Sequence, residues 1–107
     1  GEKTATASAY DLYAVDNDPL PQEGTFDVIL DSKDQAVCIV EITKVSIQPF
    51  HQVSADHAYK EGEGDKSLAY WRQVHEEVFT EWMSEAGLTF TPDSKVVLEE
   101  FRKVYPL

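Results

Sequence analysis

The sequence has a single cysteine and no long apolar run. Cys38 has no second cysteine with which to form an internal disulfide, which fits a reducing compartment. No apolar stretch approaches the roughly 20 residues that a membrane-spanning helix needs. These absences favour a cytoplasmic protein whose partners do not include a membrane.

Basic residues are scarce as well. Nine Lys and Arg face 20 Asp and Glu, so the net charge is −11. Proteins that bind nucleic-acid backbones neutralise phosphates with Lys and Arg, and an acidic chain is repelled unless its basic residues cluster on one face. The composition therefore argues against a tight binder of DNA duplexes. It argues less against a small uncharged ligand such as a nucleoside.

The remaining composition is that of a folded domain. The 107 residues are 42% hydrophobic and 11% aromatic, enough for one domain with a modest core. The sequence begins at Gly1 without a Met, and its first residues already have the pattern of an ordered element. We therefore expect that a segment upstream of Gly1 is missing.

The first half predicts strands. Thr, Tyr and Val over Thr4–Val15 indicate a strand in one or two parts, and the apolar residues of Thr25–Asp31 alternate as in a strand. Ala36–Ile47 is long, β-branched and nearly continuous, as expected of a strand that is buried on both faces or bent across a barrel. Residues rich in Asp, Asn, Pro and Gly separate the first two segments and indicate a loop.

The second half predicts two helices and a last strand. Pro49 should end the strand before it, and Ser54 is a plausible N-cap for a short helix over Ala55–Lys60. From Ser67, apolar residues recur at three- and four-residue steps until Gly87, which predicts a longer amphipathic helix. Val96–Val104 then indicates a strand. This order predicts an α+β fold, a small antiparallel β-barrel that is closed or nearly closed, with two helices.

The residues alone allow several interpretations of the chemistry. Glu61, Glu63 and Asp65 flank two glycines; they fit a helix-entry loop whose acids favour the helix N-terminus, or one of them could face a pocket. No histidine pair has the helical four-residue spacing of a zinc site, so we expect no metal and no cofactor. Tyr70, Trp71 and Trp82 could stack on bases, but helical spacing favours Trp71 and Trp82 as core residues.

Two stretches carry a family resemblance. Residues 1–6, GEKTAT, resemble the G-x-K-x-x-T signature of the ASCH domain family, and residues 61–75, EGEGDKSLAYWRQVH, resemble the EGEGD-x-S-L-x-Y-W-R-x-x-H segment of its larger bacterial members. The order of VCIVEITKV (37–45), Pro49-Phe50 and FRKVYP (101–106) also fits. The resemblance covers essentially the whole chain. It implies a single ASCH domain over 1–107, a PUA-like barrel, from which the helical segment that normally precedes the signature is missing.

The resemblance also implies a site. One branch of the family hydrolyses acetylated cytidine, and its signature Lys and second Thr work with a Glu; these positions fall here on Lys3, Thr6 and Glu61. This chain departs from that branch in the EGEGD insert and the longer aromatic helix. Another member type is reported to cut RNA. Three functions therefore stay open: an amidohydrolase on a modified nucleoside, a ribonuclease, and a non-catalytic module for single-stranded or structured RNA.

Further residues complete the predicted site. Glu63, Asp65, Tyr70 and Arg72 are the candidates for contacting substrate or RNA, and Lys60 and Lys66 are further basic residues near the two motifs. A shared site requires the start of the first strand to lie beside the entry into the second helix. We then expect Lys3 and Glu61 to pair within about 4 Å or through a water, because an unpaired buried charge is unfavourable. The sequence leaves the oligomeric state open.

Overall fold

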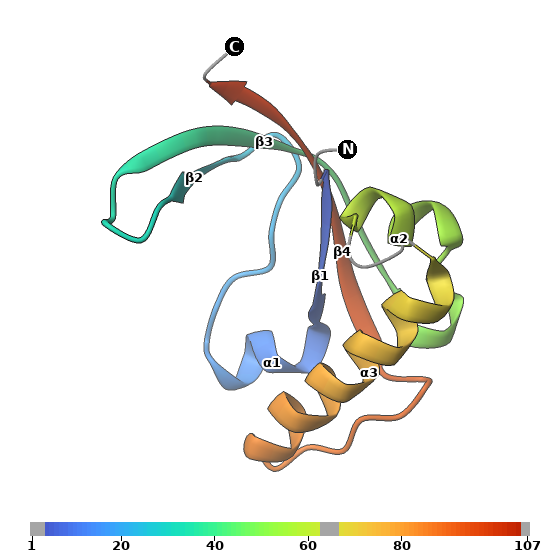
Figure 1. Cartoon of the computed structure of the whole chain (residues 1–107). Coiled ribbons are helices and arrows are strands. Elements are labelled where there is room, and N and C mark those ends of the chain that lie inside the picture. The colour runs from blue at the N-terminus through green and yellow to red at the C-terminus, as the bar shows by residue number, and fades with distance from the viewer. Residues whose placement is uncertain (1–3, 63–66, 106–107) are drawn as a thin grey trace.

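One antiparallel sheet forms the centre of the protein, and its strand order is β1-β4-β3-β2 (Figure 1). The computed structural model describes residues 4–62 and 67–105. The elements in chain order are β1 (Ala5–Ala9), α1 (Tyr10–Val15), β2 (Phe26–Leu30), β3 (Ala36–Pro49), a 3₁₀ turn (Phe50–Gln52), α2 (Ala55–Glu61), α3 (Leu68–Glu85) and β4 (Lys95–Tyr105).

The sheet curls because its longest strands are irregular. The pairing of β3 with β4 shifts register between Ile39 and Val40 and again between Ile42 and Lys44. Such bulges bend a strand and increase its twist, and β3 accordingly sweeps away from the helices into the hairpin with β2 (Figure 1). The result is a half-barrel, and the predicted α+β fold with antiparallel pairing is confirmed.

The hydrophobic core lies between one face of the sheet and helices α2 and α3. Trp71, Phe79 and Met83 point inward from α3 at spacings of eight and four residues, and each is at most 2% exposed. Phe50 stacks on Trp71 with ring centroids 5.4 Å apart. Alternate residues of β1 and β4, including Ala9, Val96 and Leu98, complete this core.

The predictions for the extent of the first strand, for the number of helices and for Trp82 are wrong. Only Ala5–Ala9 of the predicted strand Thr4–Val15 is extended, and Tyr10–Val15 forms α1. The described residues therefore contain three α-helices where two were expected. Trp82 is 49% exposed and lies outside the core. Of the two alternatives for Ala36–Ile47, the bent strand is the one observed: its first half belongs to the projecting hairpin, where Val37 is half exposed, and its register shifts bend it across the half-barrel. The prediction that Pro49 ends this strand is confirmed, because Pro49 is the last residue of β3, where no ladder donor is needed.

Candidate functional site

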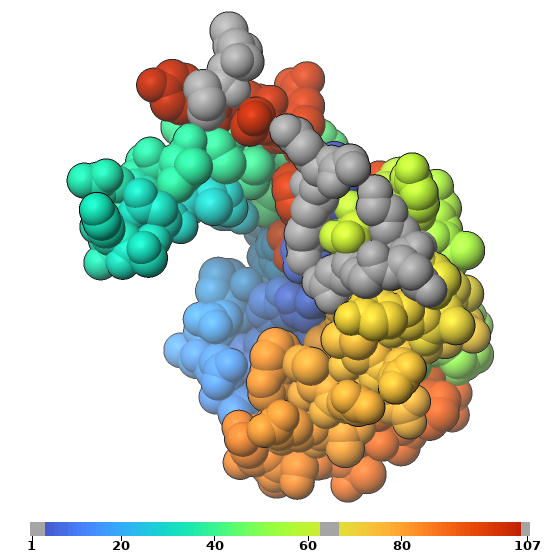
Figure 2. Space-filling model, viewed as in Figure 1, coloured from blue at the N-terminus to red at the C-terminus, as the bar shows by residue number. Residues whose placement is uncertain are grey.

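Thr6 lies on the concave face of the sheet, opposite helices α2 and α3. Ala5 and Ala9 are buried, whereas the side chains of Thr4 and Thr6 alternate to the other face. There they line a cavity of about 540 Å³, which is called here the sheet cavity and is within the size range of small-molecule sites. All four strands contribute to its wall: Thr4, Thr6, Asp27, Ile29, Cys38, Val40, Ile42, Glu99, Phe101 and Lys103. Figure 2 shows the hollow between the β2–β3 hairpin and the α1 region.

Glu99 is the cross-strand neighbour of Thr6 in this cavity. The two residues are direct partners in the antiparallel pairing of β1 with β4. Burial raises the pKa of the Glu99 carboxyl, and the negative charge of Asp27 raises it further. Glu99 is absent from the set predicted on sequence alone. A signal for it exists, because β4 contains two consecutive glutamates and successive side chains of a strand point to opposite faces of the sheet.

Glu61 occupies a different environment, at the end of α2. Its carboxylate accepts from three side chains: Oε2 from His57 Nε2 at 2.7 Å and from Trp71 Nε1 at 2.6 Å, while Oε1 lies 3.3 Å from His75 Nε2. The side chain is 1% exposed. His57 lies one helical turn before Glu61, and Trp71 and His75 are brought in by the packing of α3. The sequence did not predict these three partners.

The charge of Glu61 is held firmly. Burial by itself would raise the pKa of the carboxyl, but the hydrogen bonds from His57, His75 and Trp71 outweigh burial and lower it from 4.5 to about 2. His75 has acceptors on both sides, because its Nδ1 is 2.8 Å from the carbonyl oxygen of Trp71. This geometry favours an imidazolium that donates to both. Glu61 is thus a fixed anion rather than a carboxyl that readily exchanges protons near neutral pH.

The backbone brings the start of β1 beside the end of α2. The amide of Thr4 donates to the carbonyl oxygen of Lys60 at 2.9 Å. Lys3, Glu63, Asp65 and Lys66 lie outside the described residues, so the predicted pairing of Lys3 with Glu61 remains a prediction. Among the described candidates, Thr6 lines the sheet cavity, whereas Glu61 is not part of its wall.

The remaining candidates lie on or near the helices. Tyr70 is 39% exposed on α3, and Arg72 Nη2 donates to the carbonyl oxygen of His51 at 3.0 Å. Lys60 Nζ is 2.7 Å from Glu100 Oε1 and 3.1 Å from Asp56 Oδ2. The carboxylates around Lys60 leave it little capacity to neutralise a phosphate.

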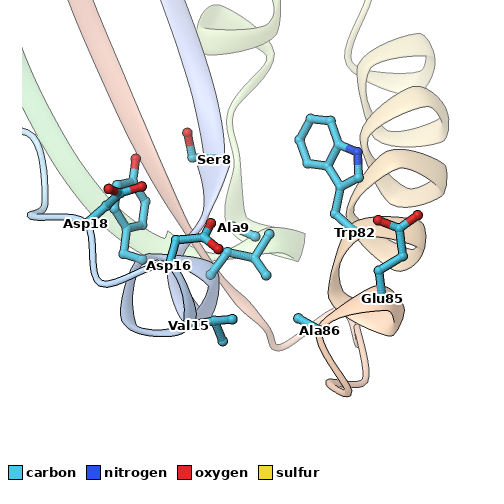
Figure 3. Close-up of a pocket in the computed structure, with 10 residues that line it drawn as sticks. Ser8, Ala9, Val15, Asp16, Asp18, Trp82, Glu85 and Ala86 are labelled. Atoms are coloured by element: carbon cyan, nitrogen blue, oxygen red, sulfur yellow. The ribbon is translucent and has the colours of Figure 1, made fainter.

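A second cavity, of about 600 Å³, lies between α1 and α3 (Figure 3). Trp82 and Glu85 from α3 stand across it from Val15 and Asp16 at the end of α1. Among the described residues that the sequence suggested for a site, Trp82 lines this cavity and the others do not. Asp16, Asp18 and Glu85 make the wall of this cavity acidic.

Residues 4–62 and 67–105 contain neither a metal-binding cluster nor a membrane-spanning helix. In that part of the chain no group of three or more His, Cys, Asp and Glu side chains is placed to hold a metal ion. No helix there is both long and apolar enough to cross a membrane.

Comparison with known proteins decides the family. A family model described as the ASCH domain matches residues 1–105. The chain belongs to the ASCH domain family. The crystal structure of an ASCH domain from Lactobacillus crispatus JV V101 is 42% identical and has a TM-score of 0.90, and a protein from Enterococcus faecalis V583 is 38% identical with a TM-score of 0.84.

The alignments cover nearly all of this chain but only part of each relative. The alignments cover 98% and 97% of this ASCH chain but only 66% and 62% of the two solved chains. None of the curated proteins compared with the chain matches it. Membership and fold are therefore established, and the activity is a matter for proposal.

Proposed function

We propose that this ASCH domain binds a modified nucleoside in the sheet cavity and hydrolyses an amide or ester on it, as in an acetylcytidine-like substrate. The observation that carries the proposal is the position of Thr6, a hydroxyl on the wall of a cavity of about 540 Å³. Apolar side chains such as Val40 and Phe101 offer surface for a base, and carboxyls offer acceptors for its N–H and hydroxyl groups. A nucleoside-processing protein of this kind would act in the cytoplasm.

The roles follow from the chemistry of the side chains. Thr6 Oγ1 attacks the acyl carbon, and Lys3, as a neutral amine, takes the hydroxyl proton and passes it to the leaving amine. The C–N bond breaks and an acyl-threonine forms, which water then hydrolyses. Glu61 follows Lys60 in the chain and supplies a fixed negative charge near the start of β1. We place this chain with the larger family members that carry the residue 61–75 motif.

The charge around the cavity supports a small ligand over a polyanion. Asp27 and Glu99 line the sheet cavity against a single described cation, Lys103, and the whole chain has a net charge of −11. Long RNA would be repelled here unless residues outside the described set compensate. Binding of RNA without catalysis, or cleavage of RNA, is therefore the alternative and an outcome of the test below.

The test is turnover of N4-acetylcytidine by the full-length protein, with Thr6→Val as the key variant. Valine matches the shape of threonine but has no hydroxyl, so we expect kcat/KM to fall by about 100-fold or more. Thr80→Val is the matched control, because Thr80 is exposed on α3. It should retain wild-type turnover.

Two results would contradict the proposal. One is equal turnover in wild type and Thr6→Val. The other is no turnover by wild type. If the inactive protein also binds single-stranded RNA, and this binding weakens steeply as salt rises, the slope reports phosphate contacts and establishes the RNA-binding alternative.

A further inference from the structure

The proposed reaction needs a group that accepts a proton from water when the acyl-threonine is cleaved. We propose that Glu99 is this general base. The inference rests on the proposed function and assigns a residue that neither the signature motifs nor the sequence pattern identified.

The sheet itself places Glu99 at Thr6. Direct partners on one face of an antiparallel pair have Cβ atoms about 4.5–5.5 Å apart, and Thr6 and Glu99 are such partners whose side chains both line the sheet cavity. The next residue, Glu100, points to the other face, where its carboxylate binds Lys60. Glu99 is thus the glutamate of β4 that a ligand in the cavity contacts.

The surroundings of Glu99 suit a base. Burial and the charge of Asp27 raise its pKa, which moves the carboxyl toward the operating pH and strengthens it as a proton acceptor. Tyr13 of α1 is another ionisable group near Glu99: burial raises the pKa of its phenol, and the charge of Glu99 raises it further. Lys103 of β4 and Cys38 of β3 are the other ionisable groups on the cavity wall. Glu61, with a pKa of about 2, is a much weaker base.

The step is balanced with water as the only co-reactant. The oxygen of water bonds to the acyl carbon, and the bond from that carbon to Thr6 Oγ1 breaks. Glu99 takes one proton from the water and returns it to Oγ1, so the threonine hydroxyl and the ionised carboxylate are both regenerated. The products are the free acid and an enzyme ready for another acylation.

The experiment uses the full-length protein, N4-acetylcytidine and Glu99→Gln, which keeps the shape of the side chain and removes the base. We expect kcat to fall by about 100-fold, while the first turnover persists and the acetyl group accumulates on the protein, as read by intact mass. Glu41→Gln is the matched control: Glu41 lies on β3, pairs with Arg102 and is not part of the cavity wall. Glu99→Asp, which retains a carboxyl, should recover part of the rate.

A pH profile supplies a second readout. The kcat of wild type should fall on acidification as Glu99 becomes protonated, and Asp27→Asn should move this limb to lower pH, because it removes the charge that raises the Glu99 pKa. Unchanged kcat in Glu99→Gln, with an active wild type, overturns the inference and leaves the proposed function standing. An inert wild type overturns both.

Discussion

Glu61 shows how a single buried residue can keep its charge inside a small protein. Three donors from two helices surround the carboxylate, and each compensates part of the hydration lost on burial. An ionised group in this position ties α2 to α3. The first role of Glu61 is therefore structural, and any part it has in the reaction proposed above is additional.

This arrangement predicts the acid stability of the protein. The folded-state pKa of Glu61 is lowered from 4.5 to about 2, so its stabilising effect is complete above pH 4.5 and is lost as the pH falls toward 2. A shift of this size corresponds to a contribution on the order of 3 kcal/mol to the free energy of unfolding. Glu61→Gln should be less stable than wild type by about that amount at pH 7, and the difference should shrink on acidification.

Chemical denaturation at several pH values measures this difference. Glu76→Gln provides the control, since Glu76 is exposed on α3, and its unfolding curve should follow that of wild type. A Glu61→Gln variant that is as stable as wild type at pH 7 would show that the hydrogen-bonded carboxylate contributes nothing net.

Among the elements, α2 matters most because it carries both His57 and Glu61. The Oγ of Ser54 caps this helix by accepting from the His57 amide at 3.1 Å, and Gly62 ends it in the left-handed conformation at φ 72°. Ser54→Ala should lower the free energy of unfolding by about 1 kcal/mol, whereas Ser54→Asp should preserve it. Urea midpoints at neutral pH distinguish them; equal midpoints for the two variants would show that the cap is not what stabilises α2.

The elements also show how much of the secondary structure the sequence patterns predict. The caps and apolar spacing predict α2 and α3 nearly to the residue, and β-branched runs predict β2, β3 and β4. The short helix α1 is missed because Tyr10, Tyr13 and Val15 have strand propensities, which tertiary packing overrides.

The site is predicted less well than the elements, for a physical reason. The contact of His57 with Glu61 has a local signal, a four-residue spacing on one helix, which the prediction missed; His75 joins the pair only through the packing of α3. Likewise, Thr6 meets Glu99 only because the register of β1 against β4 makes them partners. Such contacts between distant segments depend on tertiary structure, which local periodicity does not encode.

At the scale of the whole molecule, the charge of −11 makes the folded state repel itself. Attractive pairs such as Glu41–Arg102, with an N–O distance of 2.6 Å, oppose this, but the Arg102 side chain is 68% exposed and such pairs contribute little. The excess of like charge should dominate. Salt that screens it is therefore expected to stabilise the protein.

Thermal unfolding at neutral pH tests this expectation. The screening length falls from about 30 Å at 0.01 M salt to roughly 8 Å at 0.15 M, so the melting temperature should rise by a few degrees with added sodium chloride. The double variant Glu76→Lys, Glu77→Lys lowers the net negative charge at two exposed positions of α3 and should reduce the rise. A melting temperature that falls with salt would mean instead that the ion pairs of Lys60 and Arg102 outweigh the repulsion, because screening weakens attraction and repulsion alike.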